Sequence, residues 1–145
     1  MIEIILRAAG PGDAEAVARL ATQLGYPTSR EQAEERLRHV PEDPARLTLV
    51  ALREAEVAGW MDVAARHTLD SEPYAEIVGL VVDEQQRGAR IGEQLVAAGV
   101  EWARQRGVAE LRVRSNVVRL RAHRFYERLG FATRKSQKVF AKAIG

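Results

Sequence analysis

The sequence predicts an α/β protein with one mixed sheet and helices on both sides of it. Short apolar segments rich in β-branched residues alternate with longer segments in which apolar residues recur at helical spacing. No long linker or internal repeat divides the 145 residues, of which 46% are hydrophobic and 29% charged. This length and composition are typical of one globular domain with its own core, so we expect a single domain over residues 1–145.

Seven segments are predicted as strands, because apolar and β-branched residues gather in them between turn residues. A short Glu54-Ala55-Glu56 turn joins the second and third as a hairpin. The fourth is apolar almost throughout, which is typical of a strand buried on both faces. In chain order the predicted strands are Glu3 to Ala8, Leu47 to Arg53, Val57 to Arg66, Glu76 to Val82, Leu111 to Arg114, Phe131 to Lys135 and Lys138 to Ala143.

Four segments are predicted as helices, each with recognisable ends. Asp13 is the predicted N-cap of the first, and Ser29 with Gln32 forms a capping box at the start of the second. Gly25, Gly107 and Gly130 end the first, third and fourth helices, since glycine is common just after the last helical residue. The helices are bounded by Asp13 and Gly25, by Ser29 and about Arg38, by Ile91 and Gly107, and by Ser115-Asn116 and Gly130.

The composition argues against several kinds of site. The chain has no cysteine, so it has no disulfide framework, no thiolate nucleophile and no cysteine-based zinc site. His39, His67 and His123 are too scattered for a metal cluster, and we expect no metal. No apolar run has the length of a membrane span and the N-terminus lacks a basic leader, so we expect a cytoplasmic protein with no membrane partner.

The charge pattern gives little support to a nucleic-acid partner. The net charge is +2, and 19 of the 22 basic residues are arginine. Acidic residues are interleaved with basic ones over most of the chain, so we expect no basic tail. We therefore expect that the protein does not bind nucleic acid.

The most informative segment runs from Leu80 to Gly92, where an apolar strand gives way to a polar, glycine-containing turn and then to a helix. Backbone N–H groups at such a turn, with the positive end of a helix behind them, form an anion site. Arg87 and Arg90 add positive charge beside it. Many connections of this kind bind nothing, and this one lacks the glycine pattern of a Walker loop or a dinucleotide fingerprint.

Two motifs resemble those of the GNAT N-acetyltransferase superfamily. Arg87-Gly-Ala-Arg-Ile-Gly92 is similar to its acetyl-CoA pyrophosphate loop, of form Arg/Gln-x-x-Gly-x-Gly/Ala, which follows a strand ending in Leu-x-Val, here Leu80-Val-Val82. Ala122-His-Arg-Phe-Tyr-Glu-Arg-Leu-Gly-Phe131 resembles its closing helix and Tyr-x-x-x-Gly-Phe corner. The order of elements agrees along essentially the whole chain. The resemblance implies a mixed, mainly antiparallel sheet of six to seven strands flanked by helices.

The resemblance also implies an activity and a set of cofactor-binding residues. The activity is transfer of an acetyl group from acetyl-CoA to a primary amine, directly and within a ternary complex. An open strand edge would pair with the amide-rich pantetheine arm, and backbone N–H groups would bind the pyrophosphate. The residues implied are Leu80, Val81, Val82, Arg87, Gly88, Ala89, Arg90, Ile91, Gly92, Glu93, Asn116 and Arg119.

Two residues match catalytic positions of the superfamily. Tyr126 is the expected general acid for the leaving thiolate, and the alternative is a half-buried aromatic side chain with a structural role. Glu76 is the expected general base for the amine, and the alternatives are a solvated charge at the end of a strand or an ordered water as base. Arg90 departs from the motif, which has glycine there. Arginine would be strained if the position required a positive φ, whereas an ordinary right-handed conformation at the helix entry would accept it.

The sequence does not identify the acceptor. It can be a small-molecule amine or an amine of a protein. Homodimers are frequent in the superfamily, and Val139, Phe140 and Ile144 can serve either an interface or the core. The main alternative function is that of a non-catalytic sensor, which binds acyl-CoA on the same fold without turnover.

Overall fold

The structure is a computed structural model that describes residues 3–115 and 117–145. The chain forms two compact units, Met1–Val113 and Arg114–Gly145. The first unit contains the sheet and three of the helices, and the second contains one helix followed by an extended segment. Within the described residues, no helix is long and apolar enough to cross a membrane.

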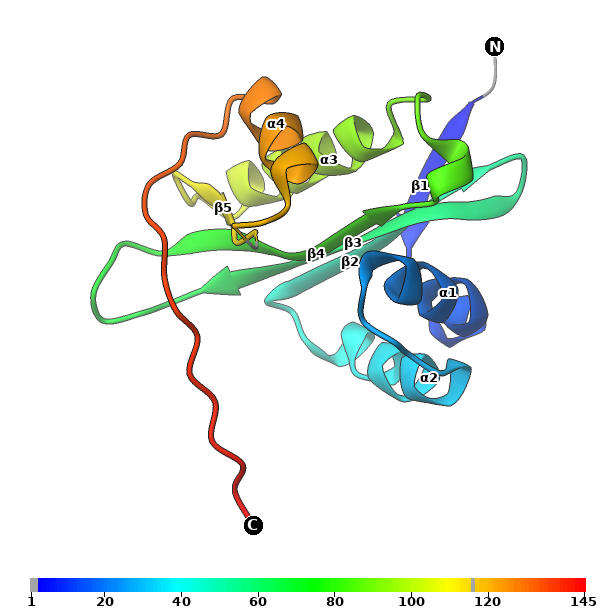
Figure 1. Cartoon of the computed structure of the whole chain (residues 1–145), viewed down its shortest axis with the longest axis horizontal. Helices are drawn as coiled ribbons and strands as arrows, with labels where there is room; N and C mark the ends of the chain where they lie inside the picture. The colour runs from blue at the N-terminus through cyan, green and yellow to red at the C-terminus, as the bar shows by residue number, and fades with distance from the viewer. Residues whose placement is uncertain (1–2, 116) are drawn as a thin grey trace. The chain divides into compact units, whose positions relative to one another are not determined.

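The first unit is built on a mixed sheet whose strands lie in chain order (Figure 1). Each of β1, β2 and β3 pairs antiparallel with the strand that follows it, whereas β4 and β5 pair parallel. A tight turn at Glu54 and Ala55 joins β2 to β3, as the sequence predicted. The strands are β1 Ile4–Ala8, β2 Arg46–Arg53, β3 Glu56–Arg66, β4 Tyr74–Val82 and β5 Leu111–Val113.

The sheet has five strands among the described residues, not the six to seven expected. The predicted strands Phe131 to Lys135 and Lys138 to Ala143 are wrong for the single chain, because residues 131–145 contain neither helix nor strand. Strand propensity reflects packing against neighbours more than an intrinsic backbone preference. A segment of strand-like composition therefore forms a strand only where a partner strand lies beside it.

Helices cover both faces of the sheet. In Figure 1, α1 (Ala14–Leu24) and α2 (Arg30–Arg38) lie on one face and α3 (Ile91–Gln105) on the other. The second unit contains α4 (Leu120–Arg128). Short 3₁₀ helices precede α1, follow α2 and follow β4.

The helix ends largely follow the sequence signals. Ser29 accepts a hydrogen bond from the Gln32 N–H at 3.1 Å, and the Gln32 side chain accepts one from the Ser29 N–H at 2.9 Å, which confirms the capping box. Asp13 occupies the N-cap position of α1, but its carboxylate does not bond to the helix. Arg7 and the Gly10 N–H donate to it instead, at 2.8–2.9 Å.

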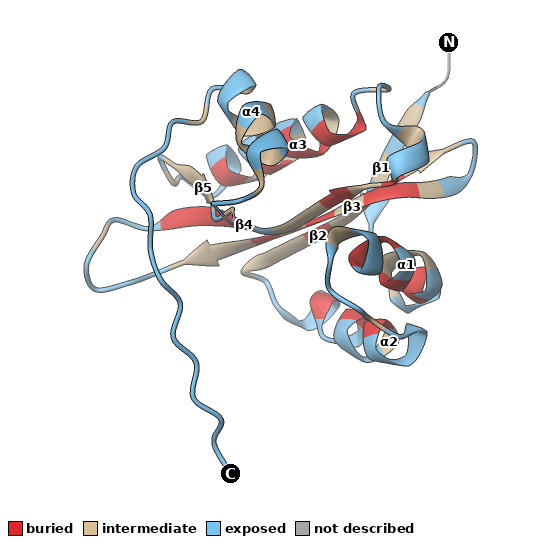
Figure 2. Cartoon of the chain, in the orientation of Figure 1, coloured by how far each residue is buried: buried red, intermediate tan, exposed pale blue. Residues whose placement is uncertain are grey.

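Buried residues, coloured red in Figure 2, lie on the strands of the sheet and on the helices that cover each of its faces. Leu37 and Val50 belong to the layer beneath α1 and α2. Met61 and Leu95 are fully buried in the layer beneath α3. At Gly59 in β3, a Cβ would lie 2.9 Å from the Val81 oxygen and 3.3 Å from the Ile91 side chain. Glycine at this position therefore lets the first turn of α3 sit directly against the sheet.

Candidate active site

Strand β4 is interrupted at its middle by a β-bulge. Ile77 pairs with Val63 and Gly79 pairs with Asp62, so Val78 has no partner in the register with β3. Its side chain is 52% exposed, in contrast to the buried residues that precede it. Bulges bend a strand, redirect its side chains and are common beside active sites.

The same point in β4 marks the end of its pairing with β5. The parallel ladder stops where Ile77 pairs with Val113, although β4 continues to Val82. Among the described residues, the second half of β4 has no strand neighbour on its β5 side. The backbone groups along that edge can pair with an extended, amide-bearing ligand. The predicted residues Leu80, Val81 and Val82 all lie on this edge.

A network of polar side chains fixes the loop after β4 to helix α1. Arg19 donates to the Asp83 carboxylate at 2.8 Å. The Gln23 amide donates to the same carboxylate at 3.5 Å and accepts from the Glu84 N–H at 3.1 Å. Asp83 also accepts from the Gln85 N–H at 3.0 Å, so it caps the 3₁₀ turn of the loop. Helix α1 therefore bonds to the loop through one of its side chains, Asp83, and through one of its backbone N–H groups, that of Glu84.

Sequence reasoning missed Arg19, Gln23 and Asp83 as supports of the loop. The Gln85 N–H and then the Arg19 and Gln23 side chains hold the pKa of Asp83 below its usual value, against the opposing effect of burial. Asp83 therefore stays charged at neutral pH and keeps the network intact. The hydrogen bond from the Gln85 N–H to the Asp83 carboxylate is a local pattern that a sequence can indicate, because an aspartate often bonds to the backbone two residues further on. The partners of Asp83 on α1 are 60 and 64 positions away in the sequence, so no local pattern indicates them.

The loop ends at the uncapped N-terminus of α3. The first N–H groups of a helix have no intrahelical acceptor, and here these belong to Ile91, Gly92 and Glu93. No side chain caps this end of α3. Together with the helix dipole, the free N–H groups make an anion site. Gly88, Ala89 and Arg90 lead directly into it.

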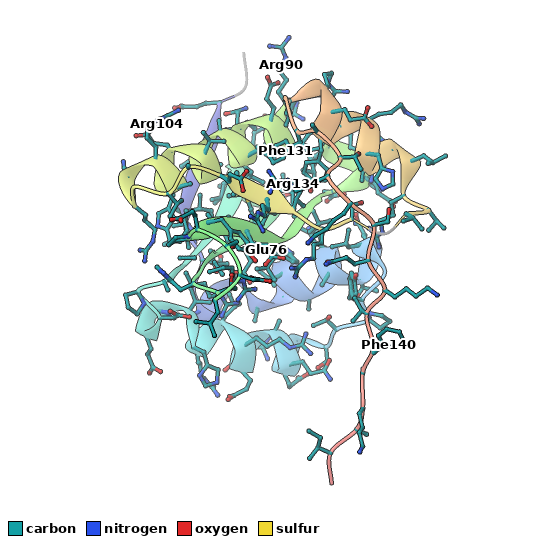
Figure 3. The ribbon with its side chains drawn as sticks, turned by 90° about the vertical axis from the view of Figure 1, so that its left-hand side faces the viewer. Glu76, Arg90, Arg104, Phe131, Arg134 and Phe140 are labelled. Carbon is teal, nitrogen blue, oxygen red and sulfur yellow. The ribbon has the colours of Figure 1, made fainter. Side chains whose placement is uncertain are left out.

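The backbone of Arg90 is left-handed, with φ 58° and ψ 28°, so of the two conformations left open by the sequence the strained one is observed. The position has the geometry for which the superfamily motif uses glycine. The Arg90 side chain lies at the surface (Figure 3) and is 82% exposed, and its Nε is 4.0 Å from a carboxylate oxygen of Glu93. Arg87 is exposed as well. Both guanidinium groups therefore lie in solvent beside the loop.

Glu76 lies near the start of β4, in the part of the strand that is paired on both sides. Its carboxylate is almost fully buried and accepts a hydrogen bond from Arg66 at 3.0 Å. In the sheet it stands between Ala64 on β3 and Arg112 on β5. The alternative of a solvated charge is excluded by this burial. Glu76 is two residues before the bulge at Val78.

Tyr126 belongs to the second unit, is partly buried and contacts two aromatic rings. Its ring meets Phe125 edge-on at a centroid distance of 5.1 Å and Phe131 at 5.4 Å. Burial raises the pKa of Tyr126 to about 12, and the charge of Arg119 opposes that shift. The phenol therefore carries its proton throughout the physiological range. Gly130, with φ 96°, ends α4 and brings Phe131 back to the Tyr126 carbonyl.

The predicted site residues fall into two sets. Unit Met1–Val113 brings together the β4 edge, the loop and the first turn of α3, with Glu76 further along the same strand. Arg119 is the N-cap of α4 and belongs with Tyr126 to the second unit. Asn116 lies outside the described residues. Within the described residues, no group of three or more His, Asp or Glu side chains can hold a metal ion.

Charge is divided unequally along the chain, so the expectation that there is no basic tail is wrong. Residues 114–145 hold nine of the 22 basic residues and only one acidic residue, Glu127, a net charge of +8. Residues 1–113 hold 13 basic and 19 acidic residues, a net charge of −6. The whole-chain value of +2 conceals this division, because the two parts nearly cancel.

Comparison with known sequences links the chain to acetyltransferases. The sequence profile described as "Acetyltransferase (GNAT) family" matches residues 15–131. An aminoglycoside N(6')-acetyltransferase type 1 of Stenotrophomonas maltophilia is 30% identical over 130 residues, which are 87% of this chain and 84% of that protein. An aminoalkylphosphonate N-acetyltransferase of Salmonella typhimurium is 38% identical over 96 residues, 66% of this chain and 61% of that protein.

Comparison with solved structures identifies the fold. The structure of an aminoglycoside N-acetyltransferase in complex with CoA superposes with a TM-score of 0.88. The superposition covers 99% of this chain and 97% of that one, at 18% sequence identity. At so low an identity the likeness establishes the fold alone.

The left-handed backbone at the end of the loop predicts an unusual response to glycine. A left-handed conformation costs an L-residue about 1–2 kcal/mol, which glycine does not incur. Glycine also lowers the free energy of unfolding by about 0.4–1 kcal/mol, because it gives the unfolded chain more conformational entropy. We therefore expect Arg90→Gly to leave the free energy of unfolding unchanged or to raise it by about 1 kcal/mol, as measured by urea denaturation.

Arg87→Gly is the matched control, because Arg87 has an ordinary extended backbone with φ −65° in the same loop. Only the entropic loss applies there, so this variant should be less stable than the parent by about 0.4–1 kcal/mol. Equal destabilisation by the two substitutions would contradict a left-handed Arg90.

Proposed function

This chain belongs to the acetyltransferase (GNAT) family and is an N-acetyltransferase, and we propose that it transfers an acetyl group from acetyl-CoA to the primary amine of a small molecule. The names of the two relatives support a small-molecule acceptor, since aminoglycosides and aminoalkylphosphonates are both small amines. The solved relative in complex with CoA supports the choice of donor.

One observation carries the choice of acetyl-CoA, namely that an anion site and an unpaired strand edge are adjacent. The uncapped N-terminus of α3 offers the N–H groups of residues 88–93 to a pyrophosphate. The edge formed by Leu80–Val82 offers backbone groups to an amide-rich arm. Arg87 and Arg90 add positive charge in solvent beside the phosphates. CoA has an anionic pyrophosphate and an amide-containing arm in one molecule, so the N–H groups of the helix end and the backbone groups of the strand edge match its two parts.

The proposed reaction is a direct transfer within a ternary complex. Bound acetyl-CoA supplies an acetyl group activated as a thioester. A backbone N–H of the β4 edge, near Leu80 or Val81, would donate a hydrogen bond to the acetyl oxygen as negative charge develops on it. The chain contains no cysteine that could carry the acetyl group as a thioester of its own. This supports attack by the amine on the donor itself.

Tyr126 is proposed as the general acid. Its raised pKa, about 12, means that it holds a proton to give at every physiological pH. Edge-on contacts with Phe125 and Phe131 restrict the rotation of its ring. Donation to the departing sulfur would leave neutral thiol and a phenolate that regains a proton from solvent. Asn116 and Arg119 are proposed as further cofactor contacts from the same part of the chain.

Glu76 is proposed as the group that accepts the proton of the attacking ammonium. Its buried carboxylate lies on the strand whose far end holds the donor site. The Arg66 guanidinium bonds to Oε1 of this carboxylate and orients it. The net charge of −6 on residues 1–113 favours the approach of a cationic amine to this unit.

The proposed function is tested by turnover with an amine panel and by Tyr126→Phe. We expect the parent protein to release CoA in the presence of an aminoglycoside or an aminoalkylphosphonate. Loss of a general acid costs about 10²–10⁴-fold, so Tyr126→Phe should lower kcat by at least about 100-fold. Its KM for acetyl-CoA should change by less than about threefold, because the phenol acts in the transition state and not in binding.

Tyr74→Phe provides the matched control. Tyr74 is a buried phenol of the first unit, and we expect its loss to leave kcat within about threefold of the parent. Binding of acetyl-CoA without turnover of any amine would indicate a sensor and would contradict an N-acetyltransferase. An unchanged kcat in Tyr126→Phe would refute the role of Tyr126 alone.

Glu76→Gln tests the proposed base separately. The amide keeps the size of the side chain but cannot accept the proton, so kcat at neutral pH should fall by about 10²-fold or more. If kcat in Glu76→Gln stays within about threefold of the parent, the proton goes to a water or to another group.

A further inference from the structure

Trp60 in β3 connects helix α1 to the middle of β4. Its indole N–H donates to the Val17 carbonyl of α1 at 3.3 Å, and its ring packs against the apolar layer beneath α1 and α2. The outer edge of the same ring lies on β4, where a Cβ on Gly79 would be 2.8 Å from Cζ3 and 3.1 Å from Cη2. Contacts on two sides therefore fix the orientation of the ring, and glycine at position 79 leaves the room that the ring occupies.

The side chains of β3 alternate between partly exposed and buried where the strand runs beside β4. Trp60, Asp62 and Ala64 are partly exposed. Met61 and Val63, which lie between them in the sequence, are fully buried. Successive side chains of a strand point to opposite faces of the sheet, so the closed face is that of α3 and the partly open face is that of Trp60. Helices α1 and α2 therefore leave part of their own face of the sheet accessible to solvent.

The partly open face is the one from which an amine can reach the proposed acetyl group. An arm paired with the edge of β4 would hold its carbonyl groups close to the plane of the sheet, as in a β-ladder, and a nucleophile attacks a carbonyl carbon from above or below that plane. On the α3 side, Leu80 lies opposite the fully buried Met61, and a Cβ on Gly99 of α3 would be 3.3 Å from the Met61 side chain. Packing thus closes that side and leaves the Trp60 side for the amine.

Two carboxylates on the same face are already paired with guanidinium groups. Asp62 accepts hydrogen bonds from Arg46 at 2.7 and 2.9 Å. Glu76 accepts one from Arg66 at 3.0 Å. A carboxylate whose charge is balanced in this way attracts an approaching ammonium group less strongly. The face of an indole ring attracts a cation through its quadrupole, and among aromatic side chains tryptophan does so best.

We propose that Trp60 binds the acceptor, with its ring against the ammonium group and the adjoining carbons of a small cationic amine. This proposal rests on the proposed function, because it needs an amine that attacks a donor bound at the β4 edge. The contact lies on the α1 and α2 face of β4, next to the bulge at Val78, whose side chain is 52% exposed. Trp60 sets the affinity for the acceptor and takes no part in proton transfer. Its loss should therefore raise the KM for the amine and spare the KM for acetyl-CoA.

The first test compares the steady-state kinetics of Trp60→Phe and Trp60→Leu with those of the parent. It uses the amine that the parent acetylates fastest in a panel that includes neamine and aminomethylphosphonate. Both variants lose the indole hydrogen bond to Val17, so they are matched for that structural loss. Phe keeps an aromatic face and Leu does not, so the KM for the amine should rise by about twofold in Trp60→Phe and by about tenfold in Trp60→Leu. The KM for acetyl-CoA should stay within about twofold of the parent in both.

The second test observes Trp60 directly through its fluorescence. The chain has two tryptophans, and the other, Trp102, lies on α3 with Arg106 over its ring at 4.8 Å. Trp102→Phe leaves Trp60 as the sole tryptophan and should keep the kcat and KM of the parent. When the same amine is added to this variant in the presence of CoA, the emission of Trp60 should be quenched or shifted. In Trp60→Phe the same titration should leave the emission of Trp102 unchanged.

The proposal is overturned if the KM for the amine in Trp60→Leu stays within about twofold of the parent, or if the emission of Trp60 does not respond to the amine. Equal increases in the two KM values, shared by Trp60→Phe and Trp60→Leu, would show a structural role alone and would overturn it as well. A parent that acetylates no amine of the panel contradicts the proposed function, and this inference fails with it. A parent that is active while Trp60→Leu keeps its KM leaves the proposed function standing.

Discussion

The constraint on which the rest of the structure depends is the short pairing between β4 and β5. Three residues of a nine-residue strand pair with β5, and the bulge at Val78 marks the point where the pairing stops. A fully paired β4 would have no backbone groups to offer a ligand. The half that is left open leads into the loop, and the loop leads into the uncapped helix. One strand edge and one helix end are therefore continuous, and this is the surface on which we propose that CoA binds.

Packing and charge hold that surface in place from two sides. Gly59 allows Ile91 to lie directly on the sheet, which sets the position of the α3 N-terminus. Asp83, bound by Arg19 and Gln23, ties the loop to α1 on the opposite face. The donors that would meet a phosphate are therefore fixed before the ligand arrives, and a preorganised site loses less entropy on binding.

The helix ends and the loop motif could be predicted from sequence, because each depends on residues that are close together in the chain. Ser29 with Gln32 and the glycine after each long helix mark their elements correctly, and the loop motif predicts an anion site. The bulge at Val78 and the contacts of Asp83 depend on residues distant in the chain, which a local pattern does not contain. The sequence left the conformation of Arg90 open, because the motif's glycine indicates a left-handed backbone and the residue type argues against it. The last two predicted strands are wrong, because apolar and β-branched composition does not by itself specify a partner strand.

The most direct test of the account is to follow the backbone amides of the protein by NMR while CoA or its fragments are added. CoA should shift the amides of residues 78–82 and 88–93 more than any others in the first unit. Pantetheine, which lacks phosphate, should shift mainly the β4 edge, and inorganic pyrophosphate mainly residues 88–93. CoA that binds without perturbing either set, or that perturbs a different face of the sheet, would contradict the site described here.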